Sequence, residues 1–148
     1  MHWVLLANAA ATIFMTGLIW FVQVVHYPLF AAVGTAEFPA YSRAHQQWTT
    51  LVVGPPMLVE ALTAALLLGS RPAGVPSWSA WVGLGLVAVI WLSTALLQVP
   101  AHARLVGGFD GSVAGALVAT NWIRTAAWSA RAALVLWMVS RALEGANR

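Results

Sequence analysis

Long apolar stretches separated by short polar breaks dominate the chain. Four of them, at about residues 3–25, 48–69, 78–99 and 112–141, hold the roughly 20 or more mostly apolar residues that a membrane-spanning helix needs. Backbone polar groups in lipid must be satisfied internally, so each stretch is expected to be helical. The pattern predicts an all-α fold, an integral membrane four-helix bundle with short loops, as a single domain over residues 1–148.

The segment from Tyr27 to Gln47 is the longest connector between the apolar stretches. Polar and aromatic residues recur in it at helical spacing, which predicts a short interfacial helix before the second span. Pro100 is expected to end the third span. The Gly54-Pro55-Pro56 step lies inside the second span and predicts a kink there.

The composition excludes several classes of protein. Of the 148 residues, 61% are hydrophobic and 7% are charged, whereas a soluble domain carries about 25% charged residues. A soluble enzyme, a nucleic-acid binder and a disordered chain are therefore not expected. The net charge of +3 comes from scattered arginines without lysine, and the chain has no cysteine. Disulfides and thiolate metal sites are excluded, and the lipid bilayer is the expected surrounding.

The distribution of arginine bears on orientation. An even number of spans places both termini on one side, together with Arg71, Arg141 and Arg148, whereas Arg43 and Arg104 fall on the other side. Arginine near span ends is more frequent on the cytoplasmic side. Three arginines against two favour a multi-pass protein of the cell membrane with cytoplasmic termini.

Three of the four histidines are expected at one face of the membrane. His26 ends the first span, His45 precedes the second and His102 follows the third. Imidazole is a common metal ligand, so these three are the candidate ligands of a metal ion (iron, copper or zinc), or two of them of haem b. The alternative is that they face lipid headgroups and water.

Each span also carries polar residues at helical period, which should face the bundle interior. Glu60 and Arg124 each lie 12 residues after the start of a predicted span, Trp48 and Ser112. Both would sit about 18 Å below the same face, so the sequence predicts a pair between them, either functional or a structural ion pair. The candidate catalytic residues are Glu60, Gln98, Asn121 and Arg124, and the candidate cofactor-binding residues are Gln23 and Tyr27.

Three short motifs carry a resemblance to known proteins. They are Gln23-x-x-His26-Tyr27-Pro28-Leu29-Phe30, Gln98-Val99-Pro100-x-His102 and Thr120-Asn121-Trp122-Ile123-Arg124-Thr125. Together they resemble a group of uncharacterised bacterial four-span membrane proteins and, more distantly, the anthrone oxygenase-like membrane family. That resemblance implies four short-looped spans and cofactor-poor oxygenation of aromatic substrates. Gln98 and His102 stand where the distant family would have an asparagine-bearing pattern.

Three functions fit these observations. The first is a membrane enzyme of oxidoreductase or oxygenase type that acts on a lipid-soluble, apolar or aromatic small molecule. In it the histidines hold a metal or act as acid and base, Gln98 and Asn121 orient the substrate, and Arg124 stabilises an enolate or phenolate. The second is a small proton-coupled transporter, whose missing inverted repeat a homo-oligomer would supply. The third is a haem-binding or accessory subunit of a membrane complex.

Overall fold

The computed structural model describes residues 2–146, and the described chain is helical apart from its connecting loops, without β-strands. The all-α prediction is confirmed. In chain order the elements are α1 (His2–Phe21), the π-helix η1 (Val22–His26), the 3₁₀-helix η2 (Pro28–Ala32), α2 (Phe38–Gly69), α3 (Ser77–Ser93), the π-helix η3 (Thr94–Gln98), α4 (Val99–Leu105) and α5 (Gly111–Ala146).

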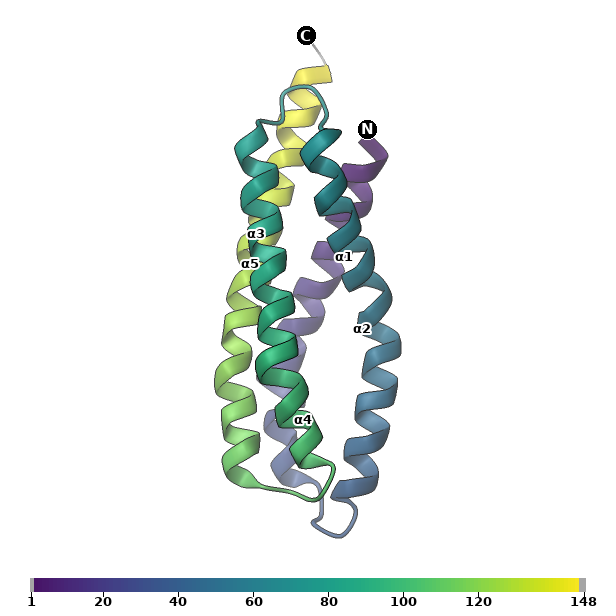
Figure 1. Ribbon diagram of the computed structural model, residues 1–148, viewed down its shortest axis with the longest axis vertical. Helices are drawn as coiled ribbons and strands as arrows, with labels where there is room; N and C mark the ends of the chain where they lie inside the picture. The colour runs from purple at the N-terminus through teal and green to yellow at the C-terminus, as the bar shows by residue number, and fades with distance from the viewer. Residues whose placement is uncertain (1, 147–148) are drawn as a thin grey trace.

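These elements form four long rods, since η1 continues α1 and η3 and α4 continue α3. Each rod packs against two neighbours, in the pairs α1 with α2, α1 with α5, α3 with α5, and α2 with α3. The start of α1, the end of α5 and the α2–α3 connection lie at one end of the bundle, called here the terminal end (Figure 1). The connections of residues 33–37 and 106–110 lie at the other end, called the loop end.

The helix boundaries correct two expectations. Residues 38–47 are the first turns of α2 rather than a separate interfacial helix, and the short helix that lies within the connector from Tyr27 onward is η2. Pro100 does not end the third rod, which continues to Leu105. Pro100 sits in the first turn of α4, directly after η3, where the regular i→i−4 ladder is already interrupted and a missing N–H costs little.

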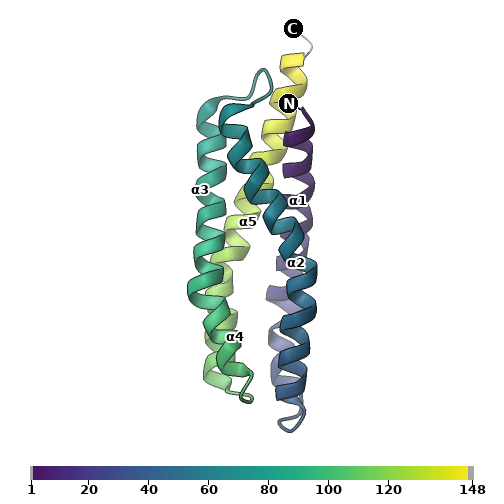
Figure 2. The same ribbon diagram turned by 45° about the vertical axis from the view of Figure 1, so that its right-hand side comes forward.

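Two prolines lie inside α2 without ending it. Pro55 and Pro56 both fall within the 32 residues of this helix. Figure 2 shows α2 changing direction near its middle, as expected where prolines remove hydrogen bonds from the helical ladder.

Three helical stretches are long and apolar enough to cross a membrane, His2–Ala32, Phe38–Gly69 and Ser77–Leu105. This indicates a membrane protein. The fourth rod, α5, is 36 residues long but carries more polar residues along its length. Arg148, one of the arginines that bears on the predicted orientation, lies outside the described residues.

The surface of the bundle is apolar, and buried polar side chains lie between the apolar clusters of its interior. Leu62, Leu96 and Leu143 are each more than 60% exposed, whereas Glu60, Gln98 and Asn121 are at most 1% exposed. A soluble bundle would rarely expose so many large apolar side chains or bury so many charged and amide groups. The buried polar side chains fall into two layers, one toward the terminal end and one toward the loop end.

A candidate ligand cavity around Arg124

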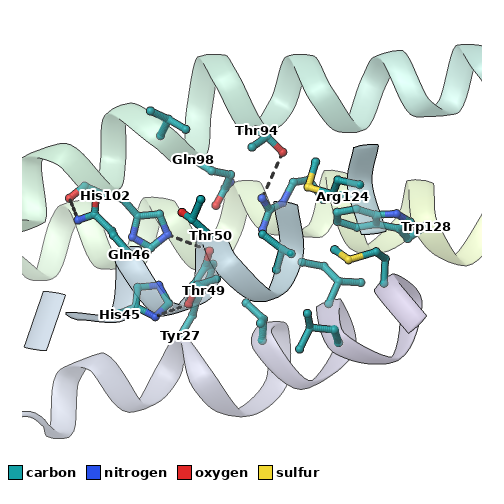
Figure 3. Close-up of a pocket in the computed structure, with 17 residues that line it drawn as sticks. Tyr27, His45, Gln46, Thr49, Thr50, Thr94, Gln98, His102, Arg124 and Trp128 are labelled. Carbon is teal, nitrogen blue, oxygen red and sulfur yellow. Dashed lines mark hydrogen bonds between the residues drawn. The ribbon is translucent and has the colours of Figure 1, made fainter. Parts of the chain in front are cut away.

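A cavity of about 270 Å³ lies between the helices in the half of the bundle near the loop end. Its walls are mostly apolar, with a small number of polar groups that point inward (Figure 3). Sites for small molecules have this make-up. The polar and aromatic residues that line it are Tyr27, His45, Gln46, Thr49, Thr50, Thr94, Gln98, His102, Arg124 and Trp128.

Arg124 is the one cationic residue among the cavity-lining side chains, and it is 9% exposed. Its Nε donates to Asn121 Oδ1 at 2.9 Å and its Nη1 donates to Thr94 Oγ1 at 3.2 Å. The guanidinium also lies over the ring of Trp128, 5.8 Å from the ring centroid, within the range of a cation–π contact. The described residues place no carboxylate within ion-pair distance of it, since their two ion pairs are Glu60–Arg131 and Arg141–Glu144.

A chain of amides behind Arg124 fixes its position. Asn121 donates from Nδ2 to Gln23 Oε1 at 2.8 Å, and Gln23 donates from Nε2 to the carbonyl of Val118 at 3.1 Å. Thr125 Oγ1 also lies 3.3 Å from Gln23 Oε1. Because arginine can only donate, every amide in this chain has one allowed orientation. Asn121 and Gln23 are therefore positioning residues for Arg124 and do not line the cavity.

Two π-helical turns lie beside the cavity. In η1 the N–H of Tyr27 donates to the carbonyl of Val22, and in η3 the N–H of Val99 donates to the carbonyl of Thr94. Such turns are rare, and within α-helices they are frequent at functional sites. Here η1 contributes Gln23 and leads into Tyr27, and η3 contributes both of its end residues to the cavity wall.

The three predicted histidines do come together. His26 Nε2 lies 2.9 Å from His45 Nδ1, and the ring centroids of His45 and His102 are 5.0 Å apart. His45 Nδ1 also lies 3.1 Å from Thr49 Oγ1, and the hydroxyl of Tyr27 lies 2.9 Å from His102 Nε2. His45 and His102 line the cavity, and His26 stands behind His45.

The arrangement of these rings does not favour a metal centre. Within residues 2–146 no group of three or more histidine and carboxylate side chains is placed to hold a metal ion. His26 and His45 direct nitrogens at each other, and His102 directs one at a phenol. The predicted metal set, His26, His45 and His102, is thus close in space without the convergence of lone pairs that ligation needs.

The predicted pair between Glu60 and Arg124 is wrong. Glu60 Oε1 accepts from Arg131 Nε at 2.7 Å and from Thr12 Oγ1 at 2.7 Å, and Glu60 Oε2 accepts from Trp128 Nε1 at 3.0 Å. Both carboxylate oxygens of Glu60 are thus hydrogen-bonded to other residues, and Glu60 does not line the cavity. Trp128 lies between Glu60 and Arg124: its N–H donates to Glu60, and the guanidinium of Arg124 lies over its ring.

The cause of this error is the position of the helix starts. Both α2 and α5 begin at the loop end, at Phe38 and Gly111. At about 1.5 Å per residue, Glu60 lies about 33 Å along α2, and Arg131 and Arg124 lie about 30 and 20 Å along α5. Glu60 therefore lies at nearly the same depth in the bundle as Arg131, and Arg131 is its ion-pair partner. The apolar pattern predicts the start of this helix at Trp48, ten residues too late. It therefore places Glu60 too close to the loop end, at the depth of Arg124 instead of Arg131.

The spacing of residues in the sequence also indicated Thr94, Trp128 and Arg131, which were not among the predicted site residues. Thr94, Gln98 and His102 are spaced by four, so they share one face of a helix, and all three line the cavity. Arg124, Trp128 and Arg131 likewise share the inward face of α5. The π-helical turns had no sequence signal that we can identify.

Comparison of the chain with protein-family models, with curated proteins and with solved structures finds no match. The resemblance stated from the three motifs therefore stays a prediction.

Proposed function

We propose that this chain is a four-span membrane enzyme that binds a lipid-soluble small molecule bearing an anionic oxygen, in the cavity around Arg124. The fourth span would be α5. Arg124 and Arg131 are buried, and the outer face of this helix is apolar, with Leu136 and Leu143 more than half exposed. Polar residues on an inward face are what a membrane-spanning helix tolerates.

The single observation that carries this proposal is the buried guanidinium of Arg124 without a carboxylate partner. A buried charge without compensation is expensive, so it is retained where a ligand completes it. Asn121 and Thr94 accept from two of its nitrogens, and the Tyr27 hydroxyl lies within hydrogen-bond reach of the guanidinium. A guanidinium has five N–H groups, so N–H groups remain to bind an oxygen anion. The apolar walls suit a hydrophobic body on the same molecule.

Access to the cavity from lipid is the second support. The wall between α2 and α4 includes Thr50 and Val99, which are both exposed on the outside of the bundle. Val99 is 57% exposed. An apolar molecule dissolved in the bilayer could therefore enter sideways without crossing water.

The chemistry that these residues can perform is proton removal. An imidazole, His45 or His102, would take a proton from a carbon beside a carbonyl or from a phenol, as a general base. Arg124 would stabilise the enolate or phenolate that forms, which is electrostatic stabilisation by a preorganised donor in a site that excludes water. Glu60 has no direct part in this step, because its carboxylate is hydrogen-bonded to Arg131, Thr12 and Trp128. The alternative of a proton-coupled transporter depended on a Glu60–Arg124 pair, and Glu60 pairs with Arg131 instead.

Binding tests the anion site. The purified protein in detergent would be titrated with 2-naphthoate and with neutral 2-naphthamide, which has a similar shape. We expect the wild type to prefer the anion and Arg124→Gln to lose about 10- to 100-fold in affinity for it, since a hydrogen bond to a charged group contributes about 1.5–3 kcal/mol. Arg43→Gln, which changes an exposed arginine outside the cavity, is the matched control. Equal affinity of wild type and Arg124→Gln for 2-naphthoate would refute the anion site.

Isotope exchange tests the chemistry. Deuterium uptake at the α-carbons of 2-tetralone in D₂O would be followed by proton NMR. We expect the wild type to accelerate exchange, and Arg124→Gln and His102→Ala to lower that rate by about 100-fold or more, the scale of one acid–base or anion-stabilising group. Exchange that is the same with and without the protein would refute the proposed proton removal for this ketone class.

A further inference from the structure

Two buried polar atoms in the cavity wall have no hydrogen-bond partner. Among the described residues, the buried side-chain atoms in this state are Gln98 Oε1, His102 Nδ1 and Ser93 Oγ, and the first two belong to residues that line the cavity. Gln98 is 1% exposed. Nearly all buried polar atoms in proteins are hydrogen-bonded, so these two atoms of cavity-lining residues need a partner that the described chain does not supply.

The orientation of the Gln98 amide is fixed by its neighbour. Gln98 Nε2 lies 3.0 Å from Thr120 Oγ1, and that hydroxyl donates its one hydrogen to the carbonyl of Ala116 at 2.7 Å. Thr120 can therefore only accept from Gln98, which requires the NH₂ group on that side. The unpartnered atom is consequently a carbonyl oxygen, an acceptor that needs an O–H or N–H donor.

His102 offers a second open group one turn further along the same face. Its Nε2 faces the Tyr27 hydroxyl at 2.9 Å. If the phenol donates, Nδ1 carries the hydrogen and is an open donor, and in the other tautomer Nδ1 is an open acceptor. A hydroxyl group can satisfy either state, because it both donates and accepts.

The positions of Thr94, Gln98 and His102 along the helix give the distance between the anion site and the unpartnered polar atoms. Thr94, Gln98 and His102 follow one another at intervals of about one helical turn, roughly 5–6 Å. Thr94 holds the guanidinium of Arg124, so the open atoms lie about one and two turns from the anion site, toward the loop end. Figure 3 shows Arg124, Gln98 and His102 in this order along the cavity.

We propose that the ligand is bifunctional, with an anionic oxygen bound by Arg124 and, one to two helical turns away, a hydroxyl group that donates to Gln98 Oε1 beside His102. This inference rests on the proposed function and adds the second polar group. The ligand class is a small apolar hydroxy acid or hydroxyphenolate, with the two oxygens at opposite ends of a rigid apolar body.

Three probes of one shape test the hydroxyl site. They are 6-hydroxy-, 6-methoxy- and 6-methyl-2-naphthoate, which share the anionic end and differ in the group at the far end. The hydroxyl donates, the methoxy oxygen only accepts, and the methyl group does neither. We expect the hydroxy compound to bind the wild type about five- to tenfold more tightly than the other two, the scale of one hydrogen bond to an otherwise unsatisfied acceptor.

A substitution locates the acceptor. Gln98→Met keeps the length of the side chain and removes the carbonyl, so the preference for the hydroxy compound should vanish, while Gln98→Glu should retain it. Gln47→Met, at an exposed position of α2 outside the cavity, should leave it unchanged. The three-probe comparison on the wild type stands even where Gln98→Met does not fold.

The outcomes separate this inference from the function on which it rests. If all three naphthoates bind with the same affinity and depend on Arg124, the anion site stands and the hydroxyl site is refuted. If the hydroxyl preference persists in folded Gln98→Met, the assignment of the acceptor is refuted. If none of the probes binds in an Arg124-dependent way, both proposals are refuted.

Discussion

Removal of the charge on Glu60 should destabilise the bundle strongly. Arg131 uses every nitrogen of its guanidinium, donating to Glu60 Oε1, to the carbonyl of Gly83, and to Asn8 and Thr12. These partners belong to α1, α2 and α3, so the network ties α5 to all three other rods. Arg131 is 3% exposed and Glu60 is 1% exposed, which leaves little water to replace a lost partner.

The magnitude follows from this burial. Glu60→Gln leaves a guanidinium that keeps its charge and also places an NH₂ group against N–H and O–H donors. Loss of one member of a buried pair costs about 3–5 kcal/mol, whereas the net stabilisation by the whole pair can be near zero. The double variant Glu60→Gln with Arg131→Gln should therefore recover much of the loss, with a coupling of about 0.5–3 kcal/mol.

The assay is thermal unfolding in detergent, followed by circular dichroism, for the two single variants and the double variant. Glu144→Gln is the matched control, because its pair with Arg141 is exposed and such pairs contribute about 0–1 kcal/mol. Strict additivity of the two single variants would refute the coupling, and a Glu60→Gln variant as stable as Glu144→Gln would refute the burial argument.

Three further predictions concern the loops and the ends of the bundle. Hydrogen bonds from Ser112 hold the pKa of Asp110 below its usual value. The stabilisation by Asp110 is therefore present at neutral pH and is lost as the pH falls through its lowered folded-state pKa. Thermal unfolding as a function of pH should show this loss in the wild type and not in Asp110→Asn. A Cβ at Gly145 would collide with the backbone of Ala73 in the α2–α3 loop. Gly145→Ala should therefore lower stability by about 1–3 kcal/mol, the usual cost of overpacking, measured by thermal unfolding. Reporter fusions after Gly34 and after Gly108 should report the same side of the membrane, and opposite sides would refute the four-span topology.

The fold could be predicted because it follows from composition and periodicity alone. Four long apolar stretches with short breaks between them allow few arrangements other than a bundle of long helices. The start of α2 could not be predicted in the same way. Residues 38–47 are polar enough to be taken as a connector, and only the structure shows them continuing as the first turns of α2.

The candidate site could be predicted in part. Inward stripes brought Gln98, Arg124 and His102 to one region, because residues spaced by three and four share a helix face. The partner of Glu60 could not be predicted, since Arg124 and Arg131 lie on the same face of α5 and differ only in depth. Depth depends on where each helix starts, and an error of ten residues in α2 moves a side chain by about 15 Å.

The two buried layers differ in a way that bears on function. In the layer toward the terminal end, the charges of Glu60 and Arg131 form an ion pair, and every nitrogen of the guanidinium donates a hydrogen bond. In the layer toward the loop end, Arg124 has no carboxylate among the described residues, and Gln98 and His102 each keep an open buried atom. A protein that needed only stability would pair the polar groups of both layers, because an unpartnered polar atom in a low-dielectric interior is costly.

Trp128 joins the two layers, because its N–H donates to Glu60 and its ring lies against Arg124. The hydrogen bond from Trp128 to Glu60 therefore holds the ring that Arg124 lies over, and the cost of the unpartnered groups supports the proposal that a ligand binds them.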